Sequence, residues 1–323
     1  MPPRPLHSRA LHRAAWWLLA IAITIVAPAV FWLMRDPEPY MRARHSAIAS
    51  IDSTTLVRDG NTVERELTLT DTSGLRVAIA VRRPVEDAPS DSTTPHRRPL
   101  YLILGGHRRG MGAGALVGDT RGSIVASLEY PFEGNDRAKG LAVVAEVPSI
   151  RRASYDTPPA VLLALDYLLS RPDVDPARVE LVGASFGAPF ATIAAALDTR
   201  ITRLWLVHAG GEPFTLIENG LRPSIAFAPA RQAVAALATL LASGPRFAPE
   251  AWVGRVAPRP VVMINARDDE RIPRRAVDAL WSRVREPRQQ IWLDGGHVQG
   301  NRPEVLRALV NTVMEYAESD QAP

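Results

Sequence analysis

The chain has 323 residues, no cysteine and a net charge of +4. Three of these charges are Arg4, Arg9 and Arg13, so the rest of the chain is close to neutral, and we expect no nucleic-acid partner. The lack of cysteine excludes disulfides, thiolate metal sites and a cysteine nucleophile, and the length suits one large α/β domain better than two small ones.

The N-terminal segment has the pattern of a membrane anchor. Residues 1–13 are basic, and the 21 residues of Ala14–Met34 carry no charge. As a helix they would span about 31 Å, enough to cross a bilayer core, and tryptophans lie near both ends. We expect a cytoplasmic flank over 1–13, a transmembrane signal-anchor over 14–34, a stalk or linker over 35–62 and an extracytoplasmic domain after it. Cleavage as a signal peptide at Ala27-Pro28-Ala29, which would give a secreted protein, is the alternative.

The folded domain is expected to cover residues 63–323 and to begin with a hairpin. Val63–Thr70 and Leu75–Arg83 each alternate between apolar and polar residues, and the turn residues 71–74 join them. The following segment, Glu86–Arg98, is rich in Pro, Ser, Thr and Asp, which predicts an exposed loop.

From residue 100 onward, predicted strands alternate with predicted helices. This alternation favours a mostly parallel, twisted sheet with helices on both faces and the hairpin at its antiparallel edge. The fold class is therefore α/β. The expected strands are Leu100–Leu104, Ser123–Leu128, Arg178–Val182, Arg203–His208, Pro260–Asn265 and Gln290–Leu293, and the main expected helices are Thr157–Ser170, Ala188–Leu197 and, approximately, Pro303–Glu318.

Residues 212–258 interrupt the alternation, because no strand is predicted there. The segment contains a predicted helix near Arg231–Leu241, and we interpret it as a small helical cap over the C-terminal ends of the strands. Its aromatic residues are candidates for an acyl pocket, although ordinary packing against the sheet is at least as good an interpretation. These residues are Phe214, Phe227, Phe247 and Trp252.

The segment Gly183–Gly187 has the pattern G-x-S-x-G, with Ser185 at its centre. A short apolar strand precedes it and an Ala-rich helix follows, which is the context of a nucleophile elbow. Side chains at the two glycines would crowd the strand against the helix in such a tight turn. The first N–H groups of the helix have no internal partner and can face the serine. The segment therefore indicates a covalent hydrolase.

A serine nucleophile needs a base, and the base needs a carboxylate that orients it. Asp269 and His297 each follow a predicted strand, in the order serine, acid, histidine that this topology requires. Asp268 is the competing choice for the acid. His208 also ends a strand, but it precedes the acid, and we expect it to pack near the site or the cap.

These residues resemble the α/β-hydrolase superfamily, over roughly Val63 to the C-terminus. Asn265–Pro273 looks like that family's acid turn, with the aspartate four residues before a proline, and Gly295-Gly296-His297 looks like its glycine-preceded histidine. Asp166–Asp175 and Ala257–Pro260 are similar to the dienelactone-hydrolase and prolyl-oligopeptidase-like branch, which includes acetyl-esterase-type enzymes.

The resemblance implies a Ser185–His297–Asp269 triad and an oxyanion hole. One donor is expected to be the N–H of Phe186, and the other lies in the loop after Leu104. Where the family often has His-Gly-Gly-Gly, this chain has Gly105-Gly106-His107-Arg108. The second donor is therefore His107 or Arg108.

The function expected from these residues is a serine hydrolase, a carboxylesterase first of all, that acts on a small-molecule ester. No cofactor is expected, and no metal site, because the Asp, Glu and His spacing matches no motif such as H-E-x-x-H. One alternative is a peptidase or amidase of the prolyl-oligopeptidase type, although those enzymes usually have a large extra domain that Arg35–Glu64 is too short to supply. Another alternative is a non-catalytic, membrane-tethered binding module. The sequence leaves the oligomeric state open.

Overall fold

The computed structural model forms two compact units, Met1–Asp36 and Pro37–Pro323. It describes residues 13, 16, 17, 19, 20, 23, 24, 27, 31, 35–85, 96–107, 109–138, 140, 142–242, 244–298 and 302–319. Most of the expected anchor Ala14–Met34 lies outside the described residues. Within those ranges, no helix combines the length and the apolar character needed to cross a membrane.

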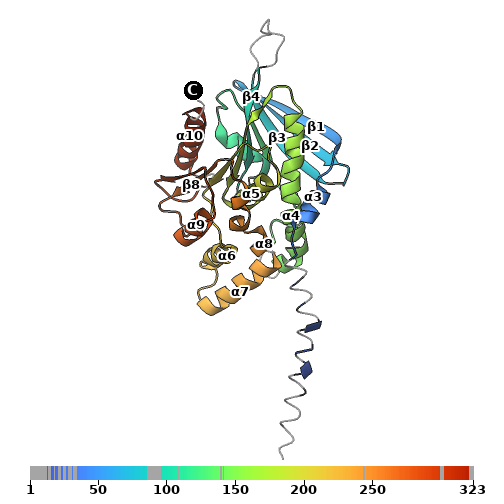
Figure 1. Cartoon of the computed structure of the whole chain (residues 1–323), viewed down its shortest axis with the longest axis vertical. Coiled ribbons are helices and arrows are strands. Elements are labelled where there is room, and N and C mark those ends of the chain that lie inside the picture. The colour runs from blue at the N-terminus through green and yellow to red at the C-terminus, as the bar shows by residue number, and fades with distance from the viewer. Residues whose placement is uncertain are drawn as a thin grey trace, which may run out of the picture. The chain divides into compact units, whose positions relative to one another are not determined.

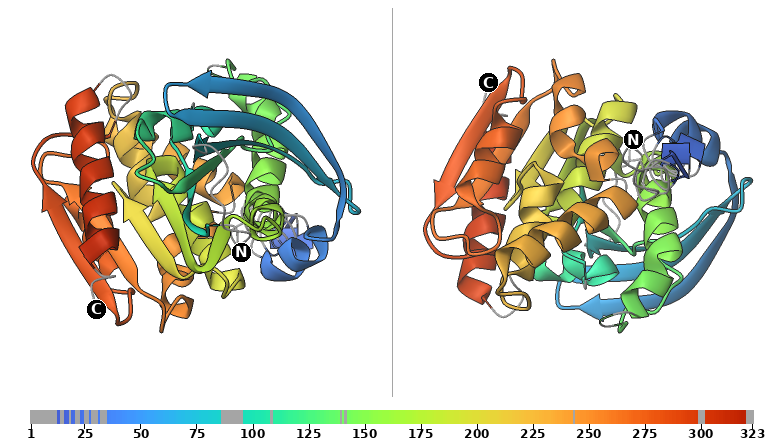
Figure 2. Two further views of the ribbon diagram at one scale, coloured as in Figure 1. Left: turned by 90° about the horizontal axis from the view of Figure 1, so that it is seen from above. Right: turned by 90° about the horizontal axis from the view of Figure 1, so that it is seen from below.

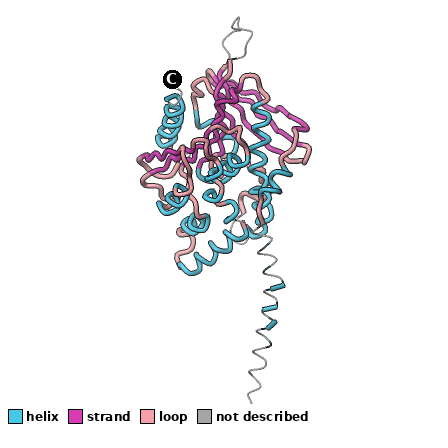
Figure 3. Tube along the Cα trace, viewed as in Figure 1, coloured by secondary structure: helices cyan, strands magenta, loops and turns pink. Residues whose placement is uncertain are grey.

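The described part of the second unit contains a nine-stranded sheet in the order β1-β2-β3-β5-β4-β6-β7-β8-β9 (Figures 1 and 3). The strands from β4 to β9 pair in parallel, whereas β1, β2 and β3 are antiparallel. This confirms the predicted mostly parallel sheet. The strands are β1 (Ile48–Asp59), β2 (Thr62–Asp71), β3 (Arg76–Pro84), β4 (Arg98–Leu104), β5 (Ile124–Leu128), β6 (Val174–Ala184), β7 (Arg203–Val207), β8 (Val261–Ala266) and β9 (Arg288–Leu293).

Residues 35–62, expected as a linker, contain helix α3 (Glu38–Arg44) and the edge strand β1. Met41 of α3 is fully buried in the core, and Glu38 pairs with Arg255 at 2.8 Å. The apolar pattern of β1 is weak because the strand has a single neighbour, and its Ile51 and Val57 are exposed. The folded unit therefore begins near residue 37 and not at residue 63.

Helices cover both faces of the sheet (Figure 2). The larger core lies between the sheet and the helices α4 (Ala142–Leu169), α5 (Ala188–Leu197) and α9 (Arg274–Trp281). The smaller core lies on the other face, under α10 (Pro303–Ser319). Helix α5 has the predicted bounds. Helix α4 begins fifteen residues before the predicted helix Thr157–Ser170, so that Pro158 and Pro159 lie within it.

The segment 212–258 is helical, as expected. It contains α6 (Pro213–Leu221), α7 (Ala228–Leu241), α8 (Gly244–Phe247) and the short 3₁₀ turns η4 (Pro249–Ala251) and η5 (Val253–Arg255). Its aromatic residues do not form a pocket at the site. Phe247 and Trp252 are buried in the larger core, whereas Phe214 and Phe227 are exposed.

Candidate active site

Ser185 lies at a sharp turn between β6 and α5, in the 3₁₀ turn η3 (Ser185–Gly187). Its φ of 52° lies in the left-handed region, which is costly for a residue with a side chain. A Cβ at Gly183 would lie 2.6 Å from the Cβ of Ala191, and a Cβ at Gly187 would collide with the carbonyl oxygen of Leu104. The strained elbow and the steric need for both glycines are therefore confirmed.

The structure brings Ser185, His297 and Asp269 together. Ser185 Oγ lies 2.9 Å from His297 Nε2, and His297 Nδ1 lies 2.8 Å from Asp269 Oδ2. The side chain of His297 is buried, with 1% of the residue exposed. Asp268, the competing acid, has an exposed side chain and contributes its backbone N–H to the carbonyl oxygen of Gly295.

Asp269 contacts a second imidazole that the sequence did not assign to the site. His208 is fully buried at the end of β7, and its Nδ1 lies 3.0 Å from Asp269 Oδ2. The two histidine rings meet edge to face, with 5.3 Å between centroids. The carboxylate of Asp269 therefore accepts hydrogen bonds from two imidazoles. The position of His208 at a strand end was the available signal, but its place before the acid in the chain pointed away from a role.

The charge of Asp269 is stabilised by these contacts. Burial by itself would raise the pKa of Asp269, but the hydrogen bonds from His208 and His297 outweigh it and hold the pKa well below its usual range. The backbone N–H groups of Arg271 and Ile272 donate to the other oxygen, Oδ1, each at 2.9 Å. Asp269 therefore stays ionised and can orient a protonated Nδ1 of His297.

Glu270 and Arg302 hold the backbone of His297 from both sides. The N–H of His297 donates to Glu270 Oε2 at 2.9 Å, and Arg302 Nη1 donates to the carbonyl oxygen of His297 at 3.1 Å. Arg302 also pairs with Glu270 at 3.0 Å. Desolvation acts to raise the pKa of Glu270, but the N–H of His297 and the guanidinium of Arg302 lower it to about 2. A Cβ at Gly296 would collide with Arg302 Nη1 and would lie 2.8 Å from Glu270 Oε2, so a side chain there would displace the two groups that hold the histidine.

The loop after β4 lies beside the elbow. The ring of His107 meets that of Phe186 edge to face, with centroids 5.2 Å apart, and the hydroxyl of Tyr130 donates to the carbonyl oxygen of Gly105. The loop is thus close enough to Ser185 to supply a second oxyanion donor. Arg108, the other predicted donor, lies outside the described residues.

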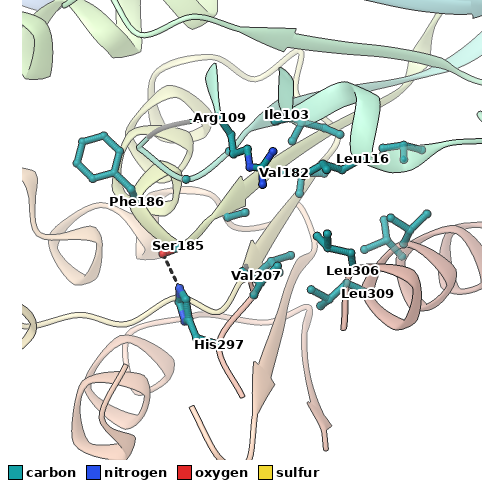
Figure 4. Close-up of a pocket in the computed structure, with 18 of the residues that line it drawn as sticks. Ile103, Arg109, Leu116, Val182, Ser185, Phe186, Val207, His297, Leu306 and Leu309 are labelled. Atoms are coloured by element: carbon teal, nitrogen blue, oxygen red, sulfur yellow. Dashed lines mark hydrogen bonds between the residues drawn. The ribbon is translucent and has the colours of Figure 1, made fainter. Parts of the chain in front are cut away.

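A cavity of about 770 Å³ opens at the serine (Figure 4). Ser185 and His297 lie at one end of it, and Leu116, Leu306 and Leu309 line the other end. None of the described residues that line it comes from segment 212–258. The cavity instead lies between the sheet, α10 and the 3₁₀ turn η2 (Gly110–Val117), on the face that carries the smaller core.

The sequence spacing predicted no metal site, yet three side chains of the site form a cluster of possible ligands. A nitrogen of His208, an oxygen of Asp269 and a nitrogen of His297 lie within 4.8 Å of one another. The hydrogen bonds from both imidazoles to the carboxylate already account for this arrangement. The close approach of the three groups is therefore explained by these hydrogen bonds.

No protein-family model and no curated protein matches the chain, but solved structures do. An acetyl xylan esterase from Paenibacillus sp. R4 aligns with a TM-score of 0.58 at 18% identity, over 85% of this chain and 92% of that one. Acetyl xylan esterase 1 from Thermoanaerobacterium sp. JW/SL YS485 aligns with a TM-score of 0.56 at 16% identity, over 86% and 93%.

A cold-adapted esterase from an Arctic intertidal metagenomic library aligns with a TM-score of 0.51 at 15% identity, over 80% of this chain and 98% of that one. An α/β hydrolase from Penicillium sp. sh18 aligns with a TM-score of 0.55 at 15% identity, over 79% and 98%. At sequence identities this low, the similarity to these structures shows the fold alone. Together with the mostly parallel sheet and the elbow after β6, they show that the chain has the fold of the α/β-hydrolase superfamily.

Proposed function

We propose that the protein is a serine hydrolase that cleaves carboxylic esters through an acyl-enzyme. One observation carries the proposal, which is the continuous chain of hydrogen bonds from Ser185 Oγ through the His297 ring to Asp269. A serine hydroxyl becomes a competent nucleophile when a neighbouring imidazole can take its proton. The arrangement needs no cofactor.

In the proposed mechanism His297 Nε2 removes the proton of Ser185 as Oγ attacks the ester carbonyl carbon. The tetrahedral intermediate collapses, and the same imidazole protonates the leaving alkoxide, so that an alcohol departs and an acyl-serine remains. Water, deprotonated by His297, then attacks the acyl carbon. The products are a carboxylic acid and free Ser185. Asp269 stabilises the imidazolium at both steps.

The oxyanion of each tetrahedral intermediate would be bound by backbone N–H groups. The N–H of Phe186 is one proposed donor, because Phe186 follows the nucleophile at the start of a helical turn. The N–H of His107 is the second, since its loop lies against Phe186.

The similarity to esterases favours ester substrates over amides. Acetyl xylan esterases and a cold-adapted esterase share the fold over most of their lengths. Amide cleavage of the prolyl-oligopeptidase type would use the same triad. Comparing kcat/KM for p-nitrophenyl acetate with that for the matching acetanilide decides between them, and faster cleavage of the anilide would contradict the esterase assignment.

Substitution of the nucleophile tests the proposal directly. Ser185→Ala should lower kcat/KM for p-nitrophenyl acetate about 10⁴-fold or more, the scale at which removal of a triad nucleophile acts. The exposed Ser282→Ala, at the end of α9, is the matched control and should retain wild-type activity. A Ser185→Ala variant that hydrolyses the ester at the wild-type rate would contradict the proposal.

We also propose that residues 14–34 anchor the enzyme in a membrane with its domain outside the cytoplasm. The uncharged run and its flanking tryptophans support this proposal. The full-length chain should stay with membranes after a carbonate wash and dissolve in detergent. Recovery in the wash, or a mature N-terminus after residue 29, would contradict anchoring.

A further inference from the structure

We propose that the cavity between η2 and α10 binds a linear aliphatic acyl chain of about eight to ten carbons, so that the preferred substrates are medium-chain esters and not acetyl esters. This inference rests on the proposed ester hydrolysis at Ser185, which it deepens by naming a substrate class. The cavity reaches Ser185 and His297 directly, so whatever fills it adjoins the reacting carbonyl.

The walls of the cavity are mostly apolar, and the charged residues among its described lining are Arg109 and Arg271. Helix α10 contributes a stripe at positions 306, 309, 310, 313 and 314, all of them Leu, Val or Met. Tyr101, Ile103, Val182 and Val207 line it from the sheet. No Asp or Glu occurs among the described lining residues. The aliphatic part of this surface gains free energy when it is covered by methylene groups.

The length of the cavity can be estimated from two of its walls. Tyr101 on β4 lies four residues before Gly105, which directly follows the strand, and this distance is about 13 Å at roughly 3.3 Å per residue. Leu306 and Met314 lie eight residues apart on α10, which spans about 12 Å at 1.5 Å per residue. An extended carbon chain advances about 1.25 Å per carbon, given bonds of about 1.5 Å and angles near 111°. The cavity therefore accepts about ten carbons.

The volume leaves room for such a chain. The cavity encloses about 770 Å³, within the range of about 300–1,000 Å³ typical of sites for drug-sized ligands. An acetyl group would leave most of that space empty. Several walls, including Leu116, Leu306 and Val310, are only half-buried in the unliganded protein and have apolar surface left to cover.

The space exists because, among the described residues, no long helix connects β4 to β5. Doubly covered sheets usually place a long helix there, whereas this chain has the short turn η2, whose sequence GMGAGALV is rich in glycine and alanine. A Cβ at Gly114 would lie 2.8 Å from Ser127 Oγ, so the turn lies directly on the sheet. Small side chains at this position leave the room that a longer helix would fill.

The test is a series of p-nitrophenyl esters from acetate to palmitate, assayed with the full-length protein at one fixed detergent concentration. We expect kcat/KM to rise about two- to fourfold per added methylene. The total gain from acetate to octanoate should be at least about fifty-fold. The values should level off or fall beyond decanoate. A parallel series of alkyl acetates, in which the alcohol is lengthened, should show no such rise.

Two bulky substitutions on facing walls, Val310→Trp and Leu116→Trp, should each lower the ratio of the octanoate to the acetate kcat/KM at least tenfold. Because the two substitutions lie on different elements, the ratio can still be measured in one variant if the other fails to fold. Ala308→Trp, exposed on the outer side of α10, is the matched control and should keep the wild-type ratio. Circular dichroism spectra that match the wild type confirm that the variants are folded.

The outcomes separate this inference from the proposed function. If acetate is cleaved and kcat/KM is flat or falls with acyl length, the acyl cavity is wrong while the hydrolase stands. If the rise appears with the alkyl acetates instead, the cavity binds the alcohol and the assignment is overturned. If no ester is cleaved and a fluorophosphonate does not label Ser185, the proposed function itself fails.

Discussion

At the residue scale, the site depends on a single carboxylate shared by two buried histidines. Asp269 Oδ2 lies 2.8 Å from His297 Nδ1 and 3.0 Å from His208 Nδ1. Only His297 reaches Ser185. His208 is therefore a positioning residue, because it fixes the carboxylate that in turn orients the base. Its own φ of 48° places it in the left-handed region, where an asparagine is tolerated better than most residues.

We expect His208→Ala to lower kcat about tenfold with little change in KM. The variant loses a hydrogen bond to a charged group, which contributes about 1.5 kcal/mol or more. Each 1.4 kcal/mol added to an activation barrier slows the reaction about tenfold. His208→Asn, whose side-chain N–H can donate to Asp269, should recover most of the rate. Steady-state kinetics with a p-nitrophenyl ester checks both. Equal losses in the two variants would mean that the imidazole acts only through packing.

At the element scale, the elbow and the histidine loop are held by close backbone contacts. The elbow packs against the end of β4 so tightly that Gly187 has no room for a Cβ. The histidine loop is held by Glu270 from the acid turn and by Arg302. Two loops that are far apart in the sequence thus place Ser185 and His297 within hydrogen-bonding distance.

Gly187→Ala should lower the free energy of unfolding by about 2 kcal/mol or more, because the added Cβ meets a backbone carbonyl that cannot rotate away. Gly220→Ala in α6 is the matched control. Nothing lies within 4 Å of its new Cβ, and a helical alanine should be neutral or stabilising by up to about 1 kcal/mol. Urea unfolding measures both values, and a Gly187→Ala variant as stable as the wild type would refute the steric account.

Glu270→Gln should lower stability at neutral pH and lose that effect in acid. The pKa of Glu270 is about 2 in the folded protein, below the value of about 4.3 for an unfolded chain. Its charge therefore stabilises the fold above about pH 4.3, and this contribution disappears as the pH falls toward 2. The side chain is 45% exposed, so solvent screening should limit the effect to about 1 kcal/mol.

Urea unfolding of the wild type and Glu270→Gln between pH 7 and pH 3 measures this difference. The difference in the free energy of unfolding should be constant down to about pH 5 and should shrink below that pH. Glu304→Gln, exposed in the first turn of α10, is the control for loss of a surface charge. A difference that stays constant down to pH 3 would show that the carboxylate charge is not what holds the loop.

At the scale of the whole molecule, most of the sheet and the three triad positions follow from local patterns. Strand β8 is buried at all six residues, and its sequence is accordingly a mostly apolar run. The glycines on either side of Ser185 indicate the elbow. The edge strand β1 was missed because exposed edge strands need few apolar residues. The first half of α4 was missed because prolines and charged residues interrupt its apolar pattern.

The cavity and the contacts of His208 and Glu270 could not be predicted from the sequence in the same way. They depend on the spacing between elements that are far apart in the chain. The stripe on α10 was visible as a helical period, but that period is the same for a helix that packs fully and for one that borders a cavity. Substrate preference is therefore a property of the assembled layers and not of any motif.

The most direct test of the account is to label the protein with a fluorophosphonate and locate the adduct by peptide mass spectrometry. We expect one adduct, on Ser185, in the native wild type, and none in Ser185→Ala or in heat-denatured wild type, because only the folded triad activates the hydroxyl. Native protein that is not labelled, or an adduct on a different serine that persists in Ser185→Ala, would contradict it.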